Sequence, residues 1–162
     1  MADEERPQFA GILTPEGKKA LEEELDNLLN VERPKNKEEL SLARSQGDLS
    51  ENADYDAARN KQAEIEGRIR QIRTMLDTYL VVEKTSGRGS VQIGSTVTVT
   101  REDTGIQSKY LIVGSSEVDL KANPKRIAYD SPIGAALMGH AKGETARIEG
   151  PSSYSVKIDR IA

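Results

Sequence analysis

The sequence lacks cysteine and tryptophan, has a single histidine, and has few aromatic residues, 4% of 162. Without cysteine, disulfides, thiolate zinc sites and cysteine nucleophiles are excluded, and the composition is compatible with a reducing compartment. With so few aromatic side chains, one large core is less favoured than a thin helical element beside a small compact domain. His140 lies near Gly139 and Gly143 without evident metal partners, which indicates a surface loop residue.

The chain also lacks an apolar run of membrane-spanning length, and residues 1–10 lack the apolar core of a signal peptide. We therefore expect a cytoplasmic protein without a membrane partner. The formal net charge of -4 argues against a general nucleic-acid surface but leaves room for a local basic patch. No P-loop, dinucleotide fingerprint or Ser–His–acid set is present.

A first long helix is predicted from Leu13 to Gln46, a stretch rich in Leu, Glu, Lys and Ala. Thr14 is suited to cap it and Pro15 to occupy its first position. Pro34 predicts a kink or a local break, because proline removes a main-chain donor and clashes with the preceding turn. The apolar stripe consists of Leu21, Leu25, Leu28 and, beyond a polar middle at Glu32, Lys35 and Glu39, Leu42.

A second helix is predicted from residues spaced alternately three and four apart, which is the pattern of a coiled-coil seam. The seam consists of Tyr55, Ala58, Gln62, Ile65, Ile69, Ile72, Leu76 and Tyr79. The connection between the helices is only a few residues long, so they must be antiparallel neighbours. The pattern predicts a two-helix coiled coil. A larger bundle is the alternative, but no further long helical pattern supplies its other members.

Residues 85–90, Thr-Ser-Gly-Arg-Gly-Ser, have the composition of a linker. After them the apolar period changes from helical to alternating, which predicts four or five short strands. The alternating residues are Val97 and Val99, Tyr110 and Ile112, Ala146 and Ile148, and Tyr154, Val156 and Ile158. A short helix from Ile133 to Met138 would be capped by Ser131, with Pro132 in its first turn. The second half is thus predicted to be a small α+β domain with a mainly antiparallel sheet.

The turn between the two helices, residues 46–52, carries the carboxylates of Asp48 and Glu51. Two carboxylates three residues apart suit one Mg²⁺ ion, which takes one or two protein carboxylates and keeps most of its water. Two ligands are too few for a tight isolated site, so a partner is expected to supply the others. The alternative is structural: Asp48 and Glu51 have capping-box spacing for the second helix, and Ser50 could serve as the cap instead.

The tip segment and three further motifs together resemble one known family. The tip reads Gly47-Asp48-Leu49-Ser50-Glu51-Asn52-Ala53-Asp54-Tyr55, followed by Ala57-Ala58-Arg59. The other motifs are Glu66-Gly67-Arg68-Ile69, Ile112-Val113-Gly114 and Ser131-Pro132-Ile133-Gly134. In this order they are similar to the GreA/GreB family of bacterial transcript cleavage (elongation) factors, and the likeness runs from Leu13 onward.

The resemblance implies an N-terminal antiparallel coiled coil, residues 1–84, then the linker and an FKBP-like antiparallel-sheet domain, residues 91–162. It implies an accessory factor, not an enzyme by itself, that binds bacterial RNA polymerase and inserts its tip into the secondary channel. There it would stimulate Mg-dependent cleavage of the 3′ end of backtracked nascent RNA. Asp48 and Glu51 would hold the second Mg²⁺ together with the polymerase; no metal is expected in the isolated protein, and the bound factor would be a monomer.

Further site residues follow from the same resemblance. Those expected to contact RNA or the channel are Arg44, Asn52 and Arg59. Those expected to contact the polymerase at the channel rim are Ser131, Pro132 and Ile133, which could also be only a helix start. For the two tip arginines the alternative is a solvated face or an intrahelical ion pair. Three surface charges that could face the channel wall are Arg68, Arg70 and Arg73.

Three positions depart from the family pattern: Ser50, Asp54 and Asp56. Asp56 adds negative charge near the tip, and an anti-cleavage subset of the family has a tip crowded with Asp. One alternative function is therefore a Gre-like regulator that occupies the same channel and inhibits polymerase. Another, independent of any family, is a coiled-coil adaptor whose tip carboxylates only cap a helix. The Asp-Leu-Ser-Glu pattern at residues 48–51 favours the cleavage type.

Overall fold

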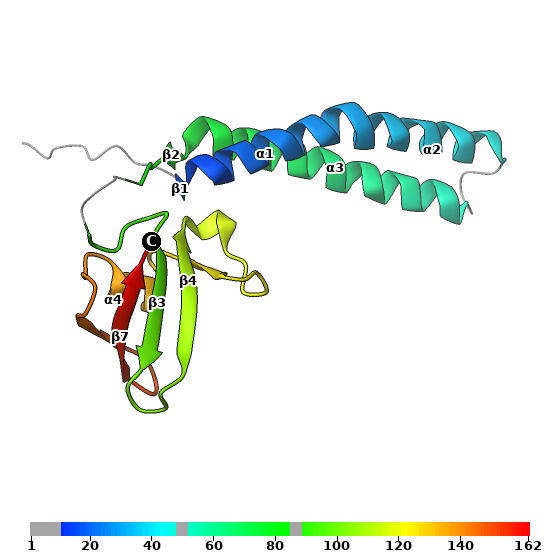
Figure 1. The fold of residues 1–162 in the computed structure, drawn as a ribbon. Coiled ribbons are helices and arrows are strands. Elements are labelled where there is room, and N and C mark those ends of the chain that lie inside the picture. The colour runs from blue at the N-terminus through cyan, green and yellow to red at the C-terminus, as the bar shows by residue number, and fades with distance from the viewer. Residues whose placement is uncertain (1–10, 48–51, 85–88) are drawn as a thin grey trace, which may run out of the picture. The chain divides into compact units, whose positions relative to one another are not determined.

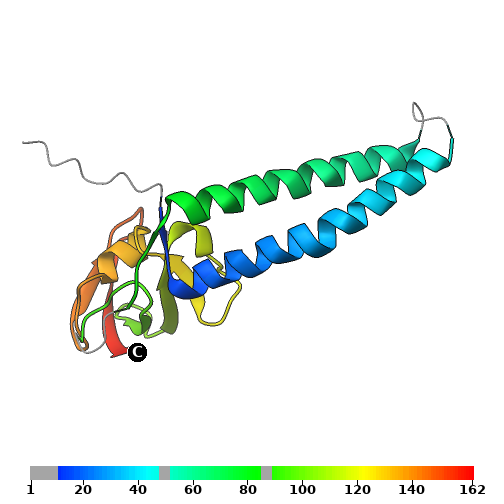
Figure 2. The same cartoon turned by 90° about the horizontal axis from the view of Figure 1, so that it is seen from above.

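A computed structural model describes residues 11–47, 52–84 and 89–162 (Figures 1 and 2). Their contacts form two compact units. One is Lys18–Tyr79, and the other combines residues 11–17 with Leu80–Ala162. These units divide the chain at residues 17 and 79, whereas the sequence placed the boundary in the linker at residues 85–90. No helix in the described part is long and apolar enough to cross a membrane.

The unit Lys18–Tyr79 is a helical hairpin. One arm consists of α1 (Pro15–Asn27), a π turn (Leu28–Glu32) and α2 (Arg33–Ser45), and the other arm is α3 (Ala53–Thr78). The predicted start of the first arm is confirmed, because α1 begins at Pro15 and the Thr14 hydroxyl accepts a hydrogen bond of 3.0 Å from Gly17 N–H.

The π turn shifts the apolar stripe of the first arm by one residue. The prediction that Leu42 belongs to the seam is wrong, since its side chain is 62% exposed. The buried residues of α2 are Asn36, Leu40 and Ala43, each one position after the predicted stripe. A π turn closes i→i+5 hydrogen bonds and so takes up one extra residue. Pro34 supplies a physical reason, because its ring would clash with the carbonyl of Asn30 in a regular α-helix.

The seam of α3 agrees closely with the predicted pattern. Its buried residues are Ala58, Ile65, Ile69, Ile72 and Met75. Near the end of the helix the buried position shifts by one residue: Met75 is buried, and Leu76, predicted on the seam, is half-buried. The predicted seam residues Tyr55, Gln62 and Tyr79 are also half-buried. A straight helix drifts relative to a strict heptad, which accounts for a one-residue error at the far end of a long helix.

Three ion pairs connect the arms and confirm that they are antiparallel. Their shortest N···O distances are 2.7 Å for Glu24–Arg68, 2.8 Å for Arg33–Glu66 and 3.4 Å for Glu39–Lys61. As the residue number rises in the first arm, the partner's number falls in the second. Hydrogen bonding to Glu24 raises the pKa of Arg68. Arg68, predicted as a surface charge that could face the channel wall, is partly exposed and paired with Glu24, whereas Arg70 and Arg73 are exposed. Contact of these three residues with the channel wall stays a prediction.

A two-stranded parallel sheet precedes and follows the hairpin in sequence. Its strands are β1 (Ile12–Leu13) and β2 (Leu80–Val81). The sequence did not reveal them, because two residues are too few to show alternation. Glu117, in a 3-10 turn (Ser115–Glu117), accepts hydrogen bonds from the Thr14 hydroxyl and main-chain N–H, the latter at 2.9 Å. This carboxylate therefore ties the β1 segment to the sheet domain.

The sheet domain contains a five-stranded sheet in the order β5-β4-β3-β7-β6. The strands are β3 (Thr96–Arg101), β4 (Gln107–Val113), β5 (Lys125–Ala128), β6 (Thr145–Ile148) and β7 (Tyr154–Ile161). The four strands that alternation predicted are confirmed. β5 was not predicted; it pairs with β4 in parallel, so the sheet is mixed, while the remaining pairs are antiparallel.

One face of this sheet holds the core, and α4 (Pro132–Leu137) packs there (Figure 1). The fully buried residues Val97, Ile112, Leu137 and Ile158 form its centre. His140 follows this helix, and its Nδ1 lies 2.8 Å from Glu144 Oε2, so it is the partly exposed loop residue that the sequence indicated.

Candidate functional site

The tip of the hairpin lies between two helix ends that the structure describes. α2 ends at Ser45 with Gln46 as its C-cap, and α3 begins at Ala53. Asp48 and Glu51 fall between these ends, outside the described residues. Their metal-binding role stays a prediction. Among residues 11–47, 52–84 and 89–162, no group of three or more acidic, histidine or cysteine side chains is placed to hold a metal ion.

Asn52 caps the second helix, and this corrects the structural alternative for the tip. Its Oδ1 accepts a hydrogen bond of 3.1 Å from Tyr55 N–H, which is the N-cap contact. Neither Asp48 nor Ser50 is the cap, because α3 begins only after Asn52. Asparagine is among the strongest N-cap residues, so its position before Ala53 was the signal that sequence reasoning missed.

The same side chain also closes the stem of the hairpin. Asn52 Nδ2 donates a hydrogen bond of 2.8 Å to the main-chain carbonyl of Ala43, in the last turn of α2. The same carbonyl accepts a hydrogen bond of 3.3 Å from Gln46 N–H, so the Asn52 amide adds a second partner, from the other arm, at this helix end. Asn52 was predicted to contact RNA or the channel. The structure shows that it connects the two helix ends, and its contact with RNA or the channel stays a prediction.

Arg44 lies over the ring of Tyr55, with 5.9 Å between its guanidinium carbon and the ring centroid. This is the outer limit of a cation–π contact, worth about 0.5–1 kcal/mol at an exposed site. The positive charge in the last turn of α2 is also favourable at a helix C-terminus. Arg44 is thus exposed, and one side of its guanidinium group contacts the ring of Tyr55. The spacing of apolar residues in the sequence could not show this contact.

Arg59 is exposed in the second turn of α3, on the other side of the tip from Arg44 in sequence. Within the described ranges, neither arginine forms an ion pair. The intrahelical ion pair that was the alternative for them is therefore not observed there. Both guanidinium groups are available to an anionic partner close to the tip.

Two further acids stand at the start of α3. Asp54 and Asp56 lie in its first turn, and Asp56 N–H donates a hydrogen bond of 3.1 Å to the carbonyl of Asn52. Negative charge at a helix N-terminus is stabilising, typically by about 0.3–1 kcal/mol. The favourable effect of a negative charge on the start of α3 is a local structural reason for an aspartate at position 56, where the chain departs from the family pattern.

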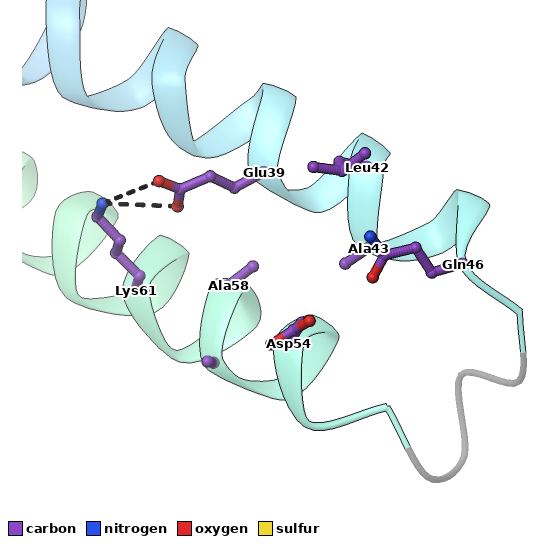
Figure 3. Close-up of a pocket in the computed structure, with 8 residues that line it drawn as sticks. Glu39, Leu42, Ala43, Gln46, Asp54, Ala58 and Lys61 are labelled. Carbon is purple, nitrogen blue, oxygen red and sulfur yellow. Dashed lines mark hydrogen bonds and ion pairs between the residues drawn. The ribbon is translucent and has the colours of Figure 1, made fainter.

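An open groove of about 320 Å³ lies beside the tip, between α2 and α3 (Figure 3). Apolar side chains of Leu42, Ala43 and Ala58 line it, with Asp54 toward the tip and the Glu39–Lys61 ion pair at its other end. The groove follows from the one-residue shift of the buried stripe of α2. This shift leaves the large side chain of Leu42 outside the seam, so that only the small side chains of Ala43 and Ala58 fill the seam there.

The second predicted site is the start of α4 in the sheet domain. Ser131 Oγ donates to the carbonyl of Ala128 at 2.6 Å and accepts from Gly134 N–H at 3.1 Å, so the predicted cap is confirmed. Pro132 is exposed and Ile133 packs partly against the core. A Cβ at Gly134 would lie 2.0 Å from the Ala128 carbonyl oxygen, so the turn is tightly packed. Contact of Ser131, Pro132 and Ile133 with a polymerase stays a prediction.

Comparison with known proteins decides the family. The model of the transcription elongation factor N-terminal domain, GreA_GreB_N, matches residues 11–81, and the model of the GreA/GreB C-terminal domain matches residues 85–162. The chain belongs to the GreA/GreB family of transcription elongation factors. Within that family, the chain length and the lack of a long basic stripe favour the GreA branch over the GreB branch.

Curated relatives agree with the GreA/GreB assignment. Transcription elongation factor GreA of Mycoplasma capricolum is 47% identical over 140 residues, which cover 85% of this chain and 88% of the relative. GreA of Rhodospirillum rubrum is 45% identical over 154 residues, 92% of this chain and 96% of the relative. Among solved structures, the GreA factor homolog 1 (Gfh1) protein of Thermus thermophilus is 25% identical with a TM-score of 0.42, over 93% of this chain and 97% of that one. Because this TM-score is below 0.5, the assignment depends on the sequence matches.

Proposed function

We propose that this GreA/GreB family member stimulates transcript cleavage by bacterial RNA polymerase. The hairpin enters the secondary channel, and the tip meets the 3′ end of a backtracked nascent RNA in the polymerase active site. The observation that carries the proposal is a division of roles at the tip. Asn52 caps α3 and closes the stem, so helix capping does not require Asp48 or Glu51.

Asp48 and Glu51 provide hard oxygen ligands of the kind that Mg²⁺ binds. Two protein ligands alone do not make a complete magnesium site. In the proposal the polymerase supplies the remaining ligands. The ion, when bound, supplies Lewis-acid chemistry to phosphodiester hydrolysis. This chain's own contribution is positioning: the two stem contacts of Asn52 hold the ends of the tip segment, and Arg44 and Arg59 offer positive charge to the RNA phosphates beside it.

The test is RNA cleavage in a backtracked elongation complex. With Mg²⁺ present, the wild-type protein is expected to shorten the RNA from its 3′ end, and Asp48→Asn and Glu51→Gln are expected to abolish this while the hairpin stays folded by circular dichroism. Asp77→Asn, an exposed acid near the far end of α3, is the matched control and should cleave normally.

Other outcomes would contradict the proposal in different ways. Polymerase binding with inhibition, and no cleavage at any Mg²⁺ concentration, would support the channel-occupying regulator. Absence of polymerase binding would support the coiled-coil adaptor. Cleavage that survives both carboxylate variants would show that the tip acids are not ligands.

A further inference from the structure

The ring of Tyr55 connects the two arms of the hairpin beside the tip. Tyr55 lies in the first turn of α3 and is half-buried, and Ala58, the next seam residue, is buried. Arg44 approaches the ring from the last turn of α2, with 5.9 Å between its guanidinium carbon and the ring centroid. A tyrosine of one arm therefore contacts an arginine of the other arm.

The side chain of Asn52 holds the main chain on both sides of this contact. Its Oδ1 accepts a hydrogen bond of 3.1 Å from the N–H of Tyr55 itself. Its Nδ2 donates one of 2.8 Å to the carbonyl of Ala43, the residue before Arg44. The main chain at positions 44 and 55 is thus held in place by bonds that involve neither the guanidinium group nor the ring. The geometry of the hairpin, and not the side chains alone, brings the two groups together.

The contact with the ring leaves the hydrogen-bond donors of Arg44 free. The N–H donors of a guanidinium group lie in its own plane, so they still point outward when one side of the group covers a ring. The residues one turn earlier in α2, Leu40 and Ser41, carry no charge. In the described part of the chain Arg44 forms no ion pair. Its donors are therefore available to an anionic oxygen, in a direction that the ring restricts.

Arg59 offers an internal comparison. It follows Tyr55 by four residues, so the two side chains lie on the same face of α3. Among the described residues, however, it forms neither a cation–π contact nor an ion pair. Arg59 thus supplies positive charge near the tip without a ring that orients it.

The charges at this end of the hairpin are balanced, so the direction of each donor matters. Asp54 and Asp56, which precede and follow Tyr55, place two negative charges close to the two positive charges of Arg44 and Arg59. Neighbouring residues of a helix do not face each other, so neither aspartate shares the face of Tyr55. A broad positive field is therefore absent among these residues. Recognition of a phosphate here has to depend on charged hydrogen bonds of defined geometry.

We infer that Tyr55 is a positioning residue for transcript cleavage: its ring holds the guanidinium group of Arg44 in the orientation that binds a phosphate of the RNA. This role rests on the proposed function and adds to it a residue that acts through another. The planar fork of arginine matches two oxygens of a phosphate group. Holding the fork in place before contact reduces the side-chain entropy that binding must remove.

The alternative role for Tyr55 is packing alone. A half-buried ring beside the seam also covers apolar surface, and its loss could loosen the hairpin near the tip. Cleavage would then slow by the same factor whichever residue occupies position 44. If Tyr55 acts through Arg44, removing the ring should matter only while the arginine is present. The two roles therefore differ in whether the loss depends on Arg44.

The test is a double-mutant cycle on the rate of RNA shortening in backtracked elongation complexes saturated with the full-length protein. A cation–π contact of about 0.5–1 kcal/mol corresponds to about two- to fivefold in rate. We expect Tyr55→Leu to slow cleavage by this factor and Tyr55→Phe, which keeps a ring, to restore it. In an Arg44→Gln background Tyr55→Leu should have no further effect, whereas in an Arg59→Gln background it should keep its full effect.

Tyr79→Leu is the matched control, because it removes a half-buried tyrosine at the other end of α3. It is expected to cleave at the wild-type rate. Equal losses from Tyr55→Leu in the two arginine backgrounds, no loss from Tyr55→Leu, or a Tyr55→Phe variant as slow as Tyr55→Leu would each overturn the positioning role and leave the proposed function intact. Absence of cleavage by the wild-type protein would instead contradict the proposed function, and the positioning role with it.

Discussion

Asn36 donates a hydrogen bond of 3.0 Å from its side-chain amide to the main-chain carbonyl of Ala58, across the seam of the hairpin. Both residues are almost completely buried, at 3% and 5% exposure. A buried amide must find a partner, and a shift of one arm along the other would separate this pair. A polar residue at one seam position is known to select register at a cost in stability. Asn36 therefore fixes how the arms are aligned below the tip.

Replacing the Asn36 amide should raise the stability of the hairpin but make the alignment of its two arms less well defined. Asn36→Leu is expected to stabilise the hairpin by about 1 kcal/mol, because an apolar side chain enters an apolar seam. The same change should broaden the distance distribution between spin labels on Ser41→Cys and Ala63→Cys, which is practical because the chain has no cysteine of its own. Asn60→Leu, at an exposed position, should change neither measurement. A destabilised variant with one sharp distance would contradict this account.

The cap at Asn52 gives a second prediction. Asn52→Ala removes the contacts to Tyr55 N–H and the Ala43 carbonyl, and it should cost about 1–2 kcal/mol in urea unfolding followed by circular dichroism. Asn52→Asp keeps the cap acceptor but loses the donor, so it should fall between wild type and Asn52→Ala. If Asn52→Ala unfolds at the wild-type midpoint, the two helix ends are held by other contacts.

The Arg33–Glu66 pair predicts a pH-dependent contribution. Hydrogen bonds from Arg33 hold the pKa of Glu66 below its ordinary value. A depressed carboxylate pKa adds stability above the unfolded-state pKa, and this stability is lost as the pH falls through the folded-state pKa. Both side chains are more than one-third exposed, so the effect is small, under about 1 kcal/mol.

Glu66→Gln should therefore lower the free energy of unfolding near pH 7, and the difference from wild type should shrink as the pH is lowered toward the acid limit of the folded state. Urea unfolding at several pH values between these limits measures it. Glu64→Gln removes an exposed carboxylate of the same helix that forms no ion pair in the described residues, so it should show no such pH trend. A difference that persists at the acidic limit would mean that Glu66 acts through packing and not through its charge.

The spacing of apolar residues correctly predicted the features that depend only on neighbouring residues in the sequence. The seam of α3 from Ala58 to Ile72 was correct because one helix keeps one face toward its neighbour over that length. The stripe of the first arm failed at Leu42, because a π turn leaves no mark in the residue pattern except the nearby proline. β5 and the β1–β2 pair were missed because their pairing involves residues distant in sequence and their length is too short for alternation.

The candidate site was predictable in part. Ser131 was identified as a cap because serine before proline is a strong local signal, and the structure confirms it. The cap of α3 was misassigned because Asp48, Ser50 and Asn52 are all good caps, and only the position of the first helical turn distinguishes them. The contact between Arg44 and the ring of Tyr55 depends on how the two arms are aligned along each other. This alignment could not be predicted from the sequence.

The π turn predicts an unusual tolerance to deletion. Val31 lies in it and is 53% exposed. Removing Val31 together with Pro34→Ala should convert the π turn into ordinary α-helix and leave Leu40 and Ala43 in the seam, with unfolding changed by less than about 1 kcal/mol. Deleting Asn60, an exposed residue of the regular helix α3, should rotate the following seam by one residue and cost several times more. Thermal unfolding compares the two deletions, and equal losses would contradict the register argument.

Two glycines of the helical arms predict effects of opposite sign. Gly67, within α3, has open space around its missing Cβ, so Gly67→Ala should stabilise by about 0.5–1 kcal/mol through helix propensity. At Gly17 a Cβ would lie 2.1 Å from Glu117 Oε1, the carboxylate that accepts from Thr14. Gly17→Ala must displace this carboxylate and is expected to destabilise by about 1–3 kcal/mol despite the same propensity gain. In Glu117→Ala that penalty should disappear, so a thermal double-mutant cycle in which Gly17→Ala remains equally costly would refute the clash as its cause.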